Sequence, residues 1–117
     1  MSAAKRFAQR ITQVNGVASF VLTRSDGLVV VHNLADPDDL ATTVTLAGAN
    51  ALAIRKTIGF SQFKYLFLPH RHGEHLLIFS LDKYFLGVQV RDDCDSAALI
   101  EEISGYLQSL LSQGRPD

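Results

Sequence analysis

The pattern of apolar and polar positions predicts a helix at each end of the chain. In residues 3–15 apolar side chains recur at steps of three and four, which places them on one helix face; Ser2 is a suitable cap and Gly16 a suitable stop. A second stripe at this spacing follows three residues suited to cap a helix, Asp93, Asp95 and Ser96. It consists of Leu99, Ile103, Leu107 and Leu110. Each terminal helix therefore offers one apolar face to a core.

Short apolar segments separated by turn residues are predicted to be strands. They are residues 17–24, 28–32, 62–68, 75–81 and 84–91. The turns at residues 25–27 and 82–83 are short, so the strands that they join should be antiparallel neighbours. Several segments are apolar at consecutive positions, which predicts a sheet covered on both faces.

A long middle helix is predicted between a cap at Asp36 and a stop at Gly59. Its segment 40–54 is fifteen residues without a charged side chain. The stripe expected to face the sheet is Leu40, Val44, Ala47, Ala51, Ile54 and Ile58. The opposite side is small and apolar as well, and a helix that is apolar all round must be covered all round. A second molecule would provide that cover, with a buried core helix of a monomer as the alternative.

The order helix, two strands, helix, three strands, helix predicts an α+β fold with three layers, α/β/α. A five-stranded antiparallel sheet should lie in the centre, with the middle helix on one face and the two terminal helices on the other. Residues 1–111 are expected to form a single domain and residues 112–117 a flexible tail.

Composition narrows the class of protein. The chain has 117 residues, a formal net charge of −1 and a pI near 6.4, which gives no support for nucleic acid or anionic membrane as partners. One cysteine, Cys94, permits no internal disulfide, and no secretory signal is visible, so we expect a cytoplasmic protein. A membrane span needs about 20 apolar residues, and the threonines and Asn50 of the middle helix disfavour one.

The candidate chemical groups are better explained without catalysis. His70, His72 and His75 suit a transition metal by type but lack zinc-type spacing, and solvated turn residues are the simpler interpretation. A second hypothesis is that their protonation below about pH 6.5 weakens the contact with a second copy of the chain or with another partner. Acidic neighbours of Cys94 disfavour its thiolate. Because no nucleophile, base and oxyanion donor converge in any known motif, we expect no enzyme and no cofactor.

The order of several short phrases resembles the Roadblock domain, the dynein-light-chain-type family that includes bacterial MglB-like partners of Ras-like GTPases. The matching phrases are Ile11 to Val14 leading into Gly16-Val17, the turn Asp26-Gly27 followed by Leu28-Val29-Val30, the small-residue helix Ala41 to Ala53 ending at Gly59, and Leu86-Gly87 in the last hairpin. The resemblance extends from about Phe7 to Leu111 and implies a profilin-like order of elements.

The resemblance implies a homodimer in which the third strands of two copies pair edge to edge and the middle helices lie side by side. The implied dimer contacts are Ala41, Thr45, Gly48, Ala49, Leu52, Phe63, Tyr65 and Phe67. It also implies a platform for a small GTPase, whose hydrolysis some relatives stimulate by reshaping the GTPase's own catalytic residues. The implied platform is Thr42, Leu46, Asn50, Ala53 and Lys56. The alternatives are a scaffold of the same fold without that effect and a small-molecule sensor.

Overall fold

The computed structural model describes residues 2–57, 65–69 and 73–113, and its elements follow the predicted order. The helices are α1 (Ala3–Thr12), α2 (Asp38–Thr57) and α3 (Ser96–Gln113). The strands are β1 (Val17–Arg24), β2 (Val29–His32), β3 (Tyr65–Leu68), β4 (His75–Leu81) and β5 (Tyr84–Val90). The predicted α+β class is confirmed.

The strands form one five-stranded sheet in the order β2-β1-β5-β4-β3, and every neighbouring pair is antiparallel. Hairpin connections join β1 to β2 and β4 to β5, as the short turns predicted. Pairing of β1 with β5 joins the two halves of the chain and leaves β2 and β3 at opposite edges. In the described part of the chain, the outer sides of these two edge strands are therefore where a further strand could add.

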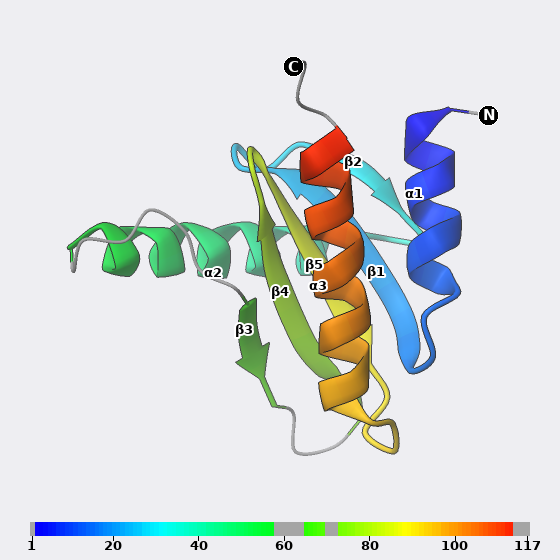
Figure 1. Ribbon diagram of the computed structural model, residues 1–117. Helices are drawn as coiled ribbons and strands as arrows, with labels where there is room; N and C mark the ends of the chain where they lie inside the picture. Colours follow the sequence, from blue (N-terminus) through cyan, green and yellow to red (C-terminus); the bar gives the residue numbers. More distant parts are fainter. Residues whose placement is uncertain (1, 58–64, 70–72, 114–117) are drawn as a thin grey trace.

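The sheet is covered on both faces, as predicted (Figure 1). On one face α1 and α3 pack over a core that includes Phe20, Leu77 and Leu86. On the other face α2 packs over a smaller core that includes Val21, Ile78 and Phe85. Alternation along the strands sends neighbouring side chains into different cores, which explains the consecutive apolar positions of β4.

Side-chain caps begin all three helices where the sequence predicted them. The Ser2 hydroxyl accepts a hydrogen bond from the Lys5 backbone N–H at 3.2 Å. The Asp36 carboxylate accepts from Asp38 N–H at 3.1 Å, and the Asp95 carboxylate accepts from Ala98 N–H at 3.1 Å. Each bond satisfies a donor that the first helical turn leaves without a partner.

Two predicted ends are wrong. The first helix ends at Thr12 instead of residue 15, because the chain turns before Gly16, which adopts φ 101°. At the other end α3 continues through Gln113, so Ser112 and Gln113 belong to the helix and not to a tail. The remaining tail, residues 114–117, and the predicted stop at Gly59 lie outside the described residues.

Candidate functional site

The face of α2 that packs on the sheet is rotated from the predicted stripe. The buried positions are Ala41, Val44, Gly48 and Ala51. Ile54, predicted to face the sheet, is 65% exposed. Each helical residue turns the direction by about 100°, so Ile54 points well to one side of the direction that these positions share.

A glycine sets that rotation. Gly48 lies over the Phe85 ring of β5, where an added Cβ would be 2.8 Å from ring atoms. Opposite Val44, Gly87 of β5 likewise has no room for a side chain. The predicted dimer contacts Ala41 and Gly48 are thus inward-facing positions: they are buried against their own sheet, and assigning them to a partner helix is wrong.

The outward surface of α2 is exposed and uncharged. We call it the outer face of α2, and it consists of Thr42, Thr43, Leu46, Ala49, Asn50, Ala53 and Ile54, all exposed. Its large apolar members, Leu46 and Ile54, are 61% and 65% exposed. Leucine and isoleucine so exposed on one helix, with only small residues and one amide between them, are typical of a contact site.

Between the inner and outer faces lie two further predicted dimer contacts. The Thr45 hydroxyl donates to the Thr23 hydroxyl of β1 at 3.4 Å, and Leu52 is half-buried against the core of the α2 face. Both border the outer face rather than forming part of it.

Strand β3 provides a second exposed surface. Tyr65 and Phe67 stand opposite Phe79 and Leu77 of β4, so their side chains lie on the side of the sheet that carries α3. Tyr65, Phe67 and Leu68 are each 41% exposed. Within the described residues β3 pairs only with β4, and Figure 1 shows α2 projecting past this same edge. We call this surface the β3 edge.

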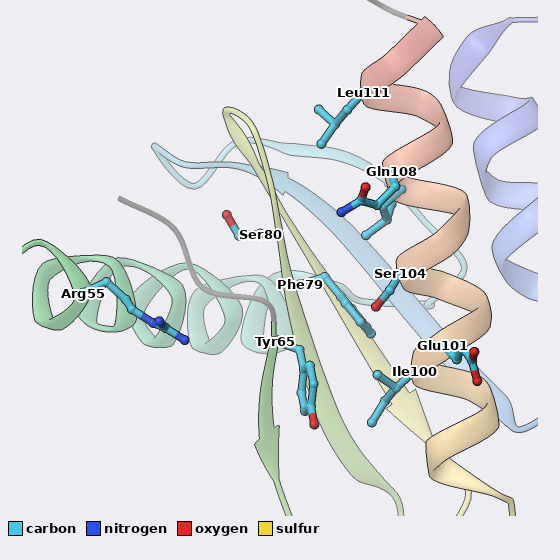
Figure 2. Close-up of a pocket in the computed structure, with 10 residues that line it drawn as sticks. Arg55, Tyr65, Phe79, Ser80, Ile100, Glu101, Ser104, Gln108 and Leu111 are labelled. Carbon is cyan, nitrogen blue, oxygen red and sulfur yellow. The ribbon is translucent and has the colours of Figure 1, made fainter. Parts of the chain in front are cut away.

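A hollow of about 600 Å³ adjoins the β3 edge, between α3 and strands β3 and β4 (Figure 2). Tyr65, Phe79 and Ile100 form part of its wall, and Arg55 reaches it from the end of α2. The Ser80 hydroxyl in this wall is buried and has no hydrogen-bond partner among the described residues. The hollow therefore makes the β3 edge concave on its α3 side.

Some predicted residues are not brought into this geometry. Phe63, His70 and His72 lie outside the described residues, as does the side chain of Lys56. His75 is described, at the start of β4, where its ring centroid lies 5.3 Å from that of Phe67.

No group of three metal-ligating side chains occurs within residues 2–57, 65–69 and 73–113. None of the helices in the same ranges combines the length and hydropathy needed to cross a bilayer.

No protein-family sequence profile matches the chain, and no curated protein matches it by sequence. Its fold, in contrast, is that of Roadblock/LC7 domains, as the sequence resemblance predicted. The Roadblock/LC7 domain of Streptomyces avermitilis aligns with TM-score 0.75 and 19% identity over 91% of this chain and 92% of that one. The gliding protein MglB of Thermus thermophilus aligns with TM-score 0.74 and 16% identity, covering 98% and 95%.

The same architecture extends to a further class of protein. Profilin IB of Acanthamoeba castellanii aligns with TM-score 0.67 and 17% identity over 97% of this chain and 100% of that one. At such identities the likeness defines the fold and leaves the function to the exposed surfaces.

Proposed function

We propose that this chain is a cytoplasmic, homodimeric adaptor of the Roadblock type that binds a Ras-like small GTPase and regulates its nucleotide cycle. The observation that carries the proposal is the outer face of α2, where Leu46 and Ile54 are 61% and 65% exposed in a helix that is uncharged from residue 40 to 54. It is an apolar surface for a protein partner, not a pocket for chemistry.

Two features support self-association. The β3 edge carries three large apolar side chains, each 41% exposed, on a strand with a free outer edge in the described chain. A second copy related by two-fold symmetry would add its own β3 there and continue the sheet. The projecting end of α2 would then lie beside the partner's α2, with Ala49 and Leu52 at or near the helix contact. The small size of Ala49 suits a close helix approach.

The GTPase platform is proposed on the remaining part of the outer face. Thr42, Leu46 and Asn50 follow one another at steps of four along α2, so they form one row on the exposed side. Two such rows, one from each copy, would make an uncharged surface that includes both Leu46 side chains. Such a surface offers no catalytic group of its own, so any effect on GTP hydrolysis would act through residues of the GTPase.

Two measurements test the proposal. Light scattering during size-exclusion chromatography at micromolar concentration should give the mass of a dimer; the mass of one chain would overturn self-association. A pull-down with purified Ras-like GTPases loaded with GTP or GDP should then recover a nucleotide-dependent complex. Single-turnover GTP hydrolysis with and without the chain separates a regulator from a scaffold of the same fold, because a scaffold binds and leaves the rate unchanged.

A further inference from the structure

A separate groove lies between the two terminal helices, on the face of the sheet opposite α2. It has a volume of about 550 Å³. Leu22, Val30, Leu81 and Tyr84 contribute to it from the strands, and Tyr106 and Leu110 from α3. Val30 is 41% exposed and both tyrosines are half-exposed, so the groove is open to solvent. Nothing in the proposed function uses it.

The groove has a closed end and an open end. The helices contact each other where the tilted rings of Phe7 and Tyr106 pack with centroids 5.8 Å apart and where Arg10 forms an ion pair with Glu102 at 3.0 Å. Arg10 also lies 5.4 Å from the centre of the Tyr106 ring. Ala3 and Ala4 of α1 and Leu110 of α3 line the part beyond these contacts. Small alanines on one wall leave room there for apolar side chains of a ligand.

The net charge around the groove is positive. Helix α1 contains Lys5, Arg6 and Arg10 and no acidic residue. Of these, Arg10 is neutralised by Glu102, whereas Lys5 and Arg6 are exposed and Arg6 lines the groove. The α3 segment beyond Tyr106, residues 107–113, has no charged residue. In the adjoining turns the charges occur as opposite pairs, Arg24 with Asp26 and Lys83 beside Asp82, so among the described residues the net charge left at the rim is positive.

We infer that this groove binds a short amphipathic segment of a partner protein whose apolar side chains enter the groove and whose flanking residues are acidic. An apolar floor with a positive rim matches an apolar stripe bordered by carboxylates. An open groove favours a peptide over a small molecule, because small ligands bury most of their surface in enclosed pockets. No residue of β3 or α2 lines the groove, so this partner and a second copy of the chain use different surfaces.

The test uses a fluorescently labelled helical peptide of about 15 residues with leucines at i, i+3, i+4 and i+7 and glutamates beside them. A matched peptide has lysine at every glutamate. Because the protein contains no tryptophan, a tryptophan label on the peptide reports binding directly. The acidic peptide should bind at least about tenfold more tightly than its lysine partner, and added salt should reduce the difference.

Protein variants locate the binding site. Val30→Glu places a carboxylate in the groove at a position already 41% exposed and should weaken binding of the acidic peptide about tenfold or more. Leu28→Glu adds the same charge nearby, at a residue that is 55% exposed and does not line the groove, and should leave affinity nearly unchanged. Arg6→Glu, an exposed change in α1, should weaken binding without disturbing the fold.

Three results would overturn the inference. They are equal affinity for the two peptides, equal effects of Val30→Glu and Leu28→Glu, or groove-dependent binding of a proline oligomer or of anionic vesicles in preference to the acidic peptide. Loss of this binding leaves the dimer mass and the GTPase pull-down untouched, so it is distinguishable from failure of the proposed function.

Discussion

Gly48 of α2 packs directly against the ring of Phe85 of β5: a Cβ on the glycine would lie 2.8 Å from the Cδ1 and Cε1 atoms of the phenylalanine. Because Gly48 has no side chain, the middle of α2 packs closely against the sheet. Because the helix is fixed there, the same contact determines which residues face outward along its whole length. The composition of the outer face of α2 thus depends on a residue that is not part of it.

The first prediction concerns this contact. Gly48→Ala should destabilise the protein, because overpacking a core costs about 1–3 kcal/mol, more than the roughly 1 kcal/mol that alanine gains in helix propensity. Gly105→Ala is the control: it is also a glycine in a helix, but nothing lies within 4 Å of its added Cβ. That variant should gain about 0.5–1 kcal/mol. Urea unfolding at one fixed protein concentration measures both, and shifts of the same sign would contradict the prediction.

The second prediction concerns the neighbour of that glycine. Ala49→Arg places a long charged side chain on the outer face and should convert the dimer to a folded monomer, because the arginine is easily solvated in one copy and has no room between two helices. Ser109→Arg, an exposed position of α3, is the control for added charge. Light scattering gives the mass and far-ultraviolet circular dichroism checks the fold. An unchanged dimer in the Ala49 variant would place the contact elsewhere.

The third prediction tests the β3 edge. Phe67→Lys puts a charge on a side chain that is already 41% exposed and should weaken self-association by at least about tenfold, since lysine on an edge strand opposes pairing. Leu28→Lys, near the opposite edge of the sheet and 55% exposed, should leave self-association unchanged. Sedimentation equilibrium gives both dissociation constants. Equal effects at the two edges would exclude β3 as the pairing strand.

The fourth prediction separates the platform from the dimer contact. Leu46→Asp should preserve the dimer mass and reduce recovery of a GTP-loaded GTPase, because an exposed leucine is lost from the proposed platform and a charge is added to an uncharged surface. Ser109→Asp, at an exposed position of α3, is the control for added charge outside the outer face. If Leu46→Asp instead yields a monomer, Leu46 belongs to the dimer contact.

The fifth prediction concerns pH. In the β1–β2 turn, hydrogen bonds from the Arg24 guanidinium and from the Leu28 backbone N–H lower the pKa of Asp26 from 3.8 to about 2. The carboxylate is favoured more in the folded than in the unfolded chain, so its contribution to stability is complete above about pH 4 and is lost as the pH falls towards 2. Carboxyl NMR titration should show Asp26 as the low midpoint, and Arg24→Gln should move it upward. An unchanged midpoint in that variant would assign the shift to the backbone alone.

Much of the fold follows from local rules. Caps at Ser2, Asp36 and Asp95 and the stripe through Leu99, Ile103 and Leu107 were predictable because each depends on residues within one or two turns of a helix. The layers also followed, since strands with apolar residues at consecutive positions require cover on both faces. The exposed position of Leu46 was also predictable, because Leu46 lies on the opposite side of an α-helix from Val44 and Ala51.

The rotation of α2 about its axis and the residues that line the two hollows could not be predicted from the sequence. Along α2 both sides are small and apolar, so periodicity is satisfied by neighbouring rotations and assigned Gly48 to the outside and Ile54 to the inside. The deciding information is Phe85, a residue distant in sequence whose ring fills the space left by the glycine. No pattern within one helix contains that contact.

By itself the amino-acid sequence determined which segments are helices and strands, their order, and the existence of more apolar surface than one subunit covers, because hydrogen bonding, capping and burial of an amphipathic face act over short distances along the chain. Only the tertiary structure decided which residues form that surface. The choice depends on how side chains from α2 and β5 interlock, and such complementarity exists only after distant parts of the chain have come together.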